Sequence, residues 1–308
     1  MILCITPNPA IDRTLIVPNL ALGQVHRATQ TIVAAGGKGL NVARTIRTLG
    51  GEPLCLGFAG GHTGHLLADL AQQEELNSAW TWTNFETRTC TILVSQNGDA
   101  TEIDEPGPAA SSSDWKRLRR DVNKTISSAD SVCISGSLPP GTPLDDFRKL
   151  LRITLQTSKQ VWVDTSGAAL DAVLAYPGLC VKVNDHEISK SLGLDMKDME
   201  TAKRALLILL ERGLAGCAIT LGAAGAFLAT KAGRWHATGP QVRVVSSVGS
   251  GDSFLGGLVT ALNGARDWPE ALRDAVAAGT ANTLLAGGGQ FRLKEFERIR
   301  EQVRVESW

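Results

Sequence analysis

Short apolar runs alternate with helix-periodic segments along most of the chain, and this alternation is the feature that most restricts its fold. Ile2–Thr6, Leu54–Phe58 and Val132–Ser135 are apolar runs of strand length. Between such runs, segments such as Gly39–Leu49 and Pro143–Gln156 carry apolar residues at helical spacing. Strands that alternate with helices predict a mostly parallel sheet covered by helices on both faces. The 308 residues would suffice for one large α/β domain or two smaller ones.

Two segments lack this alternation. Arg13–Val33 and Trp80–Ile103 are rich in Thr, Val and Ile and show no helical period. Such composition is typical of strands. We therefore expect two insertions, about residues 12–34 and 80–104, to form one small β-rich flap rather than an independent domain.

The charge balance argues against a general nucleic-acid binder. Lys+Arg and Asp+Glu both number 31, which gives a formal net charge of +0, whereas such binders usually carry a basic excess. The dense basic run Lys116–Arg120 lies on a predicted amphipathic helix, so a solvated helix face explains it better than a polyanion site.

The cysteines and the apolar segments bear on localisation. Six cysteines are widely spaced without a C-x-x-C pair, and most lie in apolar runs, as Cys4 and Cys133 do. This pattern indicates reduced, buried thiols in a cytoplasmic protein rather than disulfides or a zinc site. The N-terminal apolar run is too short for a signal peptide, and charged residues interrupt Ala205–Thr230, so we expect no secretion signal and no membrane span.

Ser247–Phe254 holds the strongest candidate for a catalytic centre. Glycines at 249 and 251 permit a ligand to approach the backbone, and the predicted helix that follows directs free N–H groups at the loop, an arrangement that binds anions. Asp252 lies in the first turn of that helix. A carboxylate beside an anion site suits deprotonation of an attacking hydroxyl, but a capping Asp at an ordinary helix start fits the local sequence equally well.

Two further motifs lie in the N-terminal region. Ala35–Arg44 combines three glycines with Lys38 and Asn41 but lacks the spacing of a Walker A loop, so by itself it could be a glycine turn. Thr6–Arg13 directly follows the first predicted strand, and ligands bind at the carboxyl ends of parallel strands. Asp12 could accept two sugar hydroxyls there or could cap a turn.

Two motifs follow later strands. Asn184 and Glu187 have the i, i+3 spacing of a helix start, which suits either Mg²⁺ held mostly through water or a simple helix cap. Thr220–Ala226 is a glycine loop between two predicted strands. It predicts a hairpin turn or, beside an adenine site, a loop that surrounds a nucleotide.

In this order the motifs resemble those of the PfkB (ribokinase-like) carbohydrate kinases over essentially the whole chain. Gly36–Arg44 and Val248–Phe254 match the two family signatures. Thr6–Arg13 and Ser135–Gly141 resemble the phosphosugar branch, which includes 1-phosphofructokinase, tagatose-6-phosphate kinase and the minor 6-phosphofructokinase. The resemblance implies a single ribokinase-like domain over residues 1–308, an α/β/α sandwich around a mostly parallel sheet, with the flap as a small β-sheet lid that commonly forms a homodimer interface.

The resemblance also implies a role for each matching residue. Asp252 would be the catalytic base, and the backbone N–H groups of Gly249, Ser250 and Gly251 would form the anion hole. Sugar hydroxyls would be held by Asp12, Gly37 and Asn41, and the substrate phosphate by Lys38, Arg88 and Ser137, with Arg27 as a weaker candidate. ATP would lie along Lys182, Asn184, Thr220, Gly222, Gly225 and Asn282, and Asn184 with Glu187 would influence Mg²⁺, largely through water.

The implied activity is ATP-dependent phosphorylation of a ketohexose phosphate, with fructose 1-phosphate as the first choice. The alternatives are 6-phosphofructokinase, tagatose-6-phosphate kinase or nucleoside kinase activity, and a non-catalytic sugar-phosphate sensor. The intact base and glycine loop argue against the sensor. Three residues depart from the family pattern, namely Ser250 in place of Ala, Val183 in place of Pro, and His186 within the N-x-x-E element.

Overall fold

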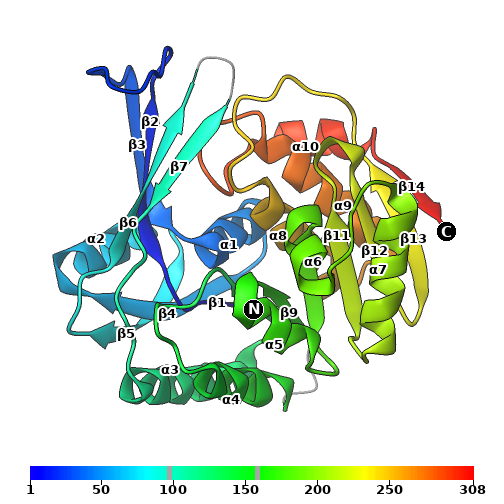
Figure 1. Cartoon of the computed structure of the whole chain (residues 1–308), viewed down its shortest axis with the longest axis horizontal. Coiled ribbons are helices and arrows are strands. Elements are labelled where there is room, and N and C mark those ends of the chain that lie inside the picture. Colours follow the sequence, from blue (N-terminus) through cyan, green and yellow to red (C-terminus); the bar gives the residue numbers. More distant parts are fainter. Residues whose placement is uncertain (96–98, 157–159) are drawn as a thin grey trace.

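Ten strands form one large sheet in the computed structural model, which describes residues 1–95, 99–156 and 160–308 (Figure 1). Its strands, in spatial order, are β14 (Arg304–Ser307), β13 (Gly233–Thr238), β12 (Ala226–Thr230), β11 (Gly216–Thr220), β10 (Cys180–Asn184), β9 (Gln160–Asp164), β8 (Ser131–Ser135), β1 (Ile2–Thr6), β4 (Pro53–Gly60) and β5 (Asn77–Thr83). The strands from β11 to β5 pair in parallel, and the other three extend the sheet by antiparallel pairing.

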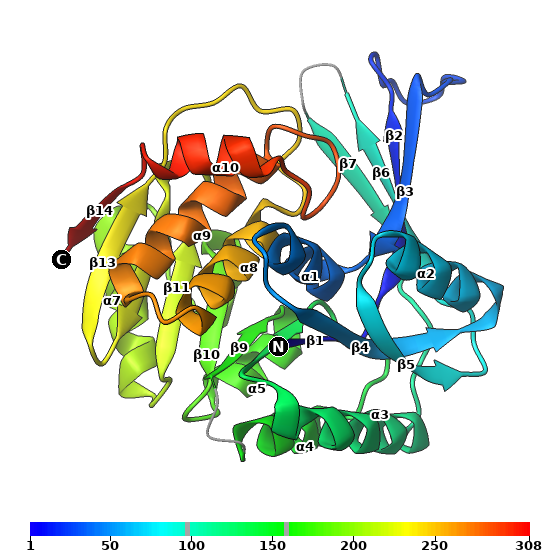
Figure 2. The same cartoon turned by 180° about the vertical axis from the view of Figure 1, so that it is seen from behind.

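Helices cover both faces of this sheet, so the predicted α/β/α sandwich is confirmed. Figure 2 shows the face covered by α1 (Lys38–Thr48), α2 (Gly61–Gln73), α8 (Ser250–Asn263), α9 (Trp268–Asn282) and α10 (Leu293–Arg300). The opposite face carries α3 (Ser112–Thr125), α4 (Leu144–Leu155), α5 (Gly167–Leu174), α6 (Asp185–Leu192) and α7 (Met199–Glu211). In the part of the chain that the structure describes, no helix combines the length and apolarity needed to cross a membrane.

Strand β1 shows why its sequence forms a central strand. Ile2 and Cys4 belong to the hydrophobic core on one face, whereas Leu3 and Ile5 belong to the core on the other. A parallel strand with helices on both sides must be apolar at every position, and all of β1 is buried. Thr6 therefore ends the apolar run at the carboxyl edge of the sheet, where the polar site begins.

A separate four-stranded sheet stands beside the large one (Figure 1). Its order is β3 (Gln30–Gly36), β2 (Ala10–Ile16), β6 (Arg88–Val94) and β7 (Ala100–Asp104), so two distant segments build it as predicted. The predicted start of the second segment at residue 80 is wrong. Trp80–Thr83 belongs to β5, whose parallel pairing with β4 in the large sheet continues to Gly60↔Thr83.

The sequence also misses elements near the C-terminal half. Helix α5 was not expected, and the last helix, α10, ends at Arg300. The chain then forms β14, whose Val305 pairs with Ala237 of β13. A strand this short has no recognisable period, so its pairing with the sheet edge decides its conformation.

Helix α8 packs unusually closely on its neighbours, and this packing positions the site at its N-terminus. A Cβ atom on Gly256 would lie 2.7 Å from Thr45 Cβ in α1. A Cβ atom on Gly257 would lie 2.8 Å from Asp274 O in α9. The two adjacent glycines therefore let the backbones of α1 and α9 approach α8 from two sides.

This close packing predicts the effect of adding one methyl group. Replacing Gly257 by Ala should lower the free energy of unfolding by about 1–3 kcal/mol, because overpacking against a backbone oxygen outweighs the gain in helix propensity of about 1 kcal/mol. Urea unfolding measures the change. Gly264→Ala at the end of the same helix is the control, since its Cβ atom would meet nothing closer than 3.5 Å. An unchanged midpoint for Gly257→Ala would contradict the packing argument.

Candidate active site

The loop Val248–Asp252, here called the catalytic loop, leads into the N-terminus of α8. Gly249 is the N-cap residue, with a φ of 76° that favours glycine. The N–H of Ser250 donates to Ser247 O at 3.1 Å, which closes a turn. Within the described residues, the N–H groups of Gly249 and Gly251 donate to no backbone oxygen. Two of the three predicted anion-hole donors are therefore available, whereas Ser250 uses its N–H in the turn.

Two lysines share one carboxylate beside this loop. Lys182 Nζ donates to Asp164 Oδ2 at 2.7 Å, and Lys38 Nζ donates to Asp164 Oδ1 at 2.7 Å. A Cβ atom on Gly251 would lie 2.5 Å from Lys182 Nζ, so this ammonium group touches the catalytic loop. Burial alone would raise the pKa of Asp164, but the two ammonium groups lower it below its usual range. The cluster thus holds positive charge against the loop.

Asp164 and the segment Gly287–Gly289 received no role from the sequence. For Asp164 a signal existed, because it is an acidic residue at the carboxyl end of a buried parallel strand. Gly287–Gly289 contacts both halves of the site. A Cβ atom on Gly249 would lie 2.4 Å from Gly288 Cα, and a Cβ atom on Gly288 would lie 2.5 Å from Asn41 Nδ2. No pattern in the local sequence predicts these contacts of Gly287–Gly289 with distant residues.

Asp252, the predicted base, lies at the centre of the site. Its side chain is buried, and Asp252 Oδ2 accepts a hydrogen bond from Asn41 Nδ2 at 2.8 Å. Burial raises the pKa of Asp252 and the nearby Asp164 carboxylate raises it further, while Lys38 and Lys182 oppose the increase. A carboxylate with a raised pKa is a stronger base than an ordinary aspartate.

Asp12 extends from β2 toward the same centre. A Cβ atom on Gly36 would lie 2.2 Å from Asp12 Cγ, so glycine at 36 makes room for this carboxyl group. Burial raises the pKa of Asp12 to about 7, although Arg44 and the hydrogen-bonded N–H of Gly37 counteract it. The predicted hydroxyl-binding residues Asp12, Gly37 and Asn41 therefore lie around one centre.

Arg88 and Ser137 are brought together through Asn8. Asn8 Nδ2 donates to Ser137 Oγ at 3.1 Å, and Asn8 O accepts from Arg88 at 3.4 Å. Arg88 also donates to Glu105 O at 3.0 Å, while its buried Nε has no partner among the described residues. An unpaired buried donor on a guanidinium group suits an anionic ligand.

Two predicted phosphate contacts lie elsewhere. The ammonium group of Lys38 is bonded to Asp164 and lies 3.4 Å from Glu187 Oε1, so it faces the catalytic loop rather than Arg88. Arg27 is exposed on the loop between β2 and β3, beyond the end of the small sheet that is farther from Asp12. A clamp of Lys38 with Arg88 would thus require Lys38 to exchange partners.

Asn184 and Glu187 form a complete helix cap at the start of α6. Asn184 Oδ1 accepts from Glu187 N at 2.8 Å, and Glu187 Oε2 accepts from Asn184 N at 3.0 Å. The alternative of a capped helix start is thus observed. Glu187 Oε1 is not used by the cap, and it faces Lys38 at 3.4 Å. Within the described ranges no group of three or more His, Cys, Asp or Glu side chains could hold a metal ion by itself.

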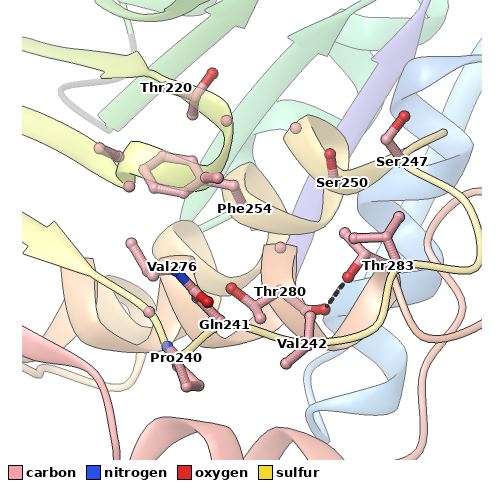
Figure 3. A pocket seen from close by; sticks show the side chains of 18 residues that line it. Thr220, Pro240, Gln241, Val242, Ser247, Ser250, Phe254, Val276, Thr280 and Thr283 are labelled. Atoms are coloured by element: carbon pink, nitrogen blue, oxygen red, sulfur yellow. Dashed lines mark hydrogen bonds between the residues drawn. The ribbon is translucent and has the colours of Figure 1, made fainter.

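A cavity of about 430 Å³ opens beside the catalytic loop (Figure 3). Ser250 and Gly251 line one end, and the predicted nucleotide residues Thr220, Gly222 and Gly225 line another. Its remaining lining is Ala223, Ala226, Gly239, Pro240, Gln241, Val242, Val244, Ser247, Phe254, Val276, Gly279, Thr280 and Thr283. The volume and the mainly apolar lining are those of a small-molecule pocket, and none of these lining residues has a charged side chain.

Asn282, which was predicted to lie along the nucleotide, is buried behind the catalytic loop. Its side chain is fully buried, donates to Val248 O at 2.8 Å and accepts from Gln290 N at 3.0 Å. It also accepts from Ser253 Oγ at 3.1 Å. Asn282 therefore fixes the catalytic loop from beneath and does not line the cavity.

Solved structures of the same fold match nearly the whole chain. Phosphofructokinase-2 from Escherichia coli in complex with fructose-6-phosphate is 28% identical, with 97% of this chain and 98% of that chain covered and a TM-score of 0.89. A Staphylococcus aureus protein assigned as a phosphofructokinase is 31% identical, with 100% and 99% covered and a TM-score of 0.83.

A Thermotoga maritima protein assigned as a 1-phosphofructokinase is 24% identical, with 100% and 99% covered and a TM-score of 0.87, so its likeness concerns the fold. The sequence itself decides the family. Residues 5–293 match the model of the pfkB family carbohydrate kinases. The site geometry and these similarities lead to one conclusion, that the chain belongs to the pfkB family of carbohydrate kinases and is a phosphotransferase.

Proposed function

We propose that the chain transfers the γ-phosphoryl group of ATP to a hydroxyl of a ketohexose phosphate. Fructose 1-phosphate is the first candidate acceptor, and fructose 6-phosphate and tagatose 6-phosphate are the alternatives. The observation that carries the proposal is the buried carboxylate of Asp252, one residue after the free N–H of Gly251 and the adjoining ammonium group of Lys182. A base, an anion site and a cation thus converge on one point.

In the proposed mechanism, Asp252 takes the proton of the attacking hydroxyl as its oxygen meets the γ-phosphorus. Negative charge on the transferring group is met by the N-terminus of α8 and by Lys182. Phosphoryl transfer depends on positioning and charge stabilisation more than on covalent catalysis, so the rigid packing of α8 serves the reaction directly.

The cavity beside the loop is the proposed site of ATP. Its apolar walls would take the adenosine, and its opening at Ser250 and Gly251 would bring the phosphates to the N-terminus of α8. The donor set fits Mg²⁺ as a hydrated ion, because the cap at α6 uses Glu187 Oε2 and leaves Glu187 Oε1 as the oxygen that faces the site. Mg²⁺ bound with ATP would offset phosphate charge there.

The phosphate of the acceptor is proposed to bind at Arg88 and Ser137. The unpaired Nε of Arg88 and the hydroxyl of Ser137 are both next to Asn8. Escherichia coli phosphofructokinase-2, which is structurally similar over 97% of this chain, forms a complex with fructose-6-phosphate. This similarity supports a phosphorylated acceptor.

The small sheet is proposed to act as a lid and to form a homodimer. On its β2–β3 loop, the side chains of Leu22 and Val25 are 99% and 91% exposed. Exposed apolar side chains at the tip of a sheet suit contact with a second copy. Escherichia coli phosphofructokinase-2 also occurs as a tetramer in an inhibited form.

The role of Asp252 predicts a specific loss on substitution. Asp252→Asn should keep the affinity for both substrates but lose at least ~100-fold in kcat, because general-base assistance contributes about 10²–10⁴-fold. ADP release in a coupled assay measures turnover, and calorimetry measures binding. Asp195→Asn on the exposed surface is the matched control. Turnover of Asp252→Asn near that of the wild type would remove Asp252 from this role.

The phosphate site predicts a preference among acceptors. The three sugar phosphates should be compared with free fructose, and kcat/KM should be at least ~100-fold higher for the best phosphorylated sugar, as expected for a lost charge-assisted contact.

Arg88→Met should raise the KM for the sugar phosphate and leave the KM for ATP unchanged. Equal kcat/KM for fructose and fructose 1-phosphate would refute the phosphosugar proposal, and nucleotide-independent binding without ADP release would indicate a sensor.

The raised pKa of Asp12 predicts a pH dependence of sugar binding. Below a pKa of about 7 the carboxyl group gains a proton and accepts fewer hydrogen bonds from sugar hydroxyls. We expect kcat/KM for the sugar phosphate to fall as the pH decreases through this value, while the KM for ATP stays constant. Asp12→Asn should be less active and should lack this component of the pH profile. A profile of Asp12→Asn with the wild-type shape would count against the assignment.

A further inference from the structure

Arg44 is a buried cation that the proposed mechanism does not use. It lies on α1, one turn after Asn41, and its guanidinium group makes hydrogen bonds in several directions. Arg44 donates to Asn41 Oδ1 at 2.9 Å, to Ala35 O at 2.8 Å and to Gly288 O at 2.5 Å. Its side chain therefore connects the proposed sugar site, the base-binding amide and the segment that packs on the catalytic loop.

The donor character of arginine determines which way the Asn41 amide points. A guanidinium group has donors and no acceptor, so the atom of Asn41 that faces Arg44 must be the carbonyl oxygen. The amide NH₂ group then faces Asp252 Oδ2 at 2.8 Å. With the amide reversed, the NH₂ group would oppose the donors of Arg44, and the amide oxygen would oppose the carboxylate of Asp252. Arg44 thus excludes the reversed amide, whose oxygen would face Asp252 and would stabilise the protonated carboxyl group.

Glu74 holds Arg44 in this position. Its Oε2 accepts from Arg44 Nε at 2.9 Å and from the Arg44 terminal nitrogen Nη2 at 2.6 Å, a two-pronged ion pair. Its Oε1 accepts from Ala35 N at 2.9 Å. The side chains are 11% and 21% exposed for Arg44 and Glu74, so water screens this pair less than a surface pair.

We propose that Glu74 and Arg44 form a positioning relay that keeps the NH₂ group of Asn41 directed at Asp252, so that the base accepts this hydrogen bond when the sugar hydroxyl arrives. The inference rests on the proposed role of Asp252 as the base. Neither Glu74 nor Arg44 contacts the reacting atoms in this arrangement. They act through Asn41, whose amide is the link between α1 and the first turn of α8.

Asp252 responds to several other groups, which the test must keep constant. The charged side chains that face it are Lys38 of α1, Lys182 of β10, Asp164 of β9, Asp12 of β2 and Glu102 of β7. None of them is bonded to Glu74. A substitution at Glu74 acts on Arg44, which reaches Asp252 through Asn41 and also contacts Gly288 and lowers the pKa of Asp12. The path through Asn41 must therefore be separated from the other two by a double-mutant cycle.

The first experiment replaces the forked guanidinium group by a single ammonium group. Arg44→Lys keeps the charge, but its single ammonium nitrogen cannot replace the two nitrogens that donate to Glu74 Oε2 and also donate to Asn41 Oδ1. We expect kcat to fall about tenfold or more, as for a lost hydrogen bond to a charged group, with the KM for ATP unchanged. The matched control is Arg47→Lys, because Arg47 pairs with Glu75 between the same two segments but on the exposed surface. Equal kcat in both variants would overturn the relay.

The second experiment measures the protonation of Asp252 without turnover. Carboxyl ¹³C NMR of aspartate-labelled protein, with Asp252→Asn for assignment, should show Asp252 titrating at higher pH in Arg44→Lys than in the wild type. The sign follows because the Asn41 bond favours the carboxylate, and losing it favours the proton. The acid limb of the kcat profile should move to higher pH in the same way. An unchanged titration would overturn the proposal even if kcat fell.

A double-mutant cycle separates the relay from a general loss of stability. In an Asn41→Ala background, Arg44→Lys should reduce kcat by less than twofold further, because the link to Asp252 is already absent. Multiplicative losses would instead indicate independent structural damage and refute the relay. If Arg44→Lys does not fold, Glu74→Gln replaces it, since glutamine keeps an acceptor for Ala35 N. It should shift the Asp252 titration in the same direction, and Glu75→Gln is its control.

The outcomes for the relay and for the proposed function can be told apart. Full activity of Asp252→Asn would refute the role of the base but would leave the NMR titration as the decisive test of the relay. An inactive Asp252→Asn with a normal Arg44→Lys would preserve the proposed function and refute the relay.

Discussion

The shared carboxylate of Asp164 is the interaction on which the rest of the site depends. A fully buried carboxylate is costly unless ion pairs and hydrogen bonds surround it, and Asp164 receives one ammonium group on each oxygen. These two bonds join β9 to β10 and to the start of α1. Glu187 Oε1 also lies 3.4 Å from Lys38 Nζ, so two ammonium groups and two carboxylates balance one another at that point.

Helix α8 holds the catalytic loop in a fixed position beside this cluster. Its N-terminus lies against Lys182, and the adjacent glycines 256 and 257 let α1 and α9 contact its backbone. Asn282 of α9 then holds Val248 O from below. The direction of the catalytic loop is thus set by three helices and one strand, which explains how a loop rich in glycine can keep one conformation. A loop with such support loses little entropy when an anion binds.

The sequence predicted the elements whose residues are decided locally. Strand β1 was recognisable because burial on both faces leaves a continuous apolar run, and helix α1 because burial of one stripe leaves a helical period. The start of α8 was recognisable from its glycines. Trp80–Thr83 was assigned to the wrong sheet because a strand's residues show that it is a strand but not which neighbour it pairs with. The buried position of Asn282 behind the catalytic loop was not predicted, because sequence does not reveal which buried side chain faces a cavity.

The cysteines show a second limit of the same kind. Their buried, unpaired state was predicted and is confirmed for all six. Their alignment was not foreseen, since Cys55, Cys4 and Cys133 lie opposite one another on three adjacent strands. Burial raises the pKa of the Cys55 thiol to about 12, so it stays neutral in the core. Small neutral side chains at this row let α1 pack close to β1, β4 and β8.

The environment of Asp252 combines two opposing requirements of a general base. Burial and Asp164 raise the pKa of Asp252, which strengthens it as a base. The same burial also favours the protonated carboxyl group, which cannot accept the proton of the hydroxyl. Lys38, Lys182 and the Asn41 amide counteract that tendency. In the proposed mechanism Lys182 also meets the charge of the transferring phosphoryl group, and an incoming anion there would weaken its effect on Asp252. The amide carries no charge that a phosphate could neutralise, so its orientation is the contribution that persists while the substrates are bound.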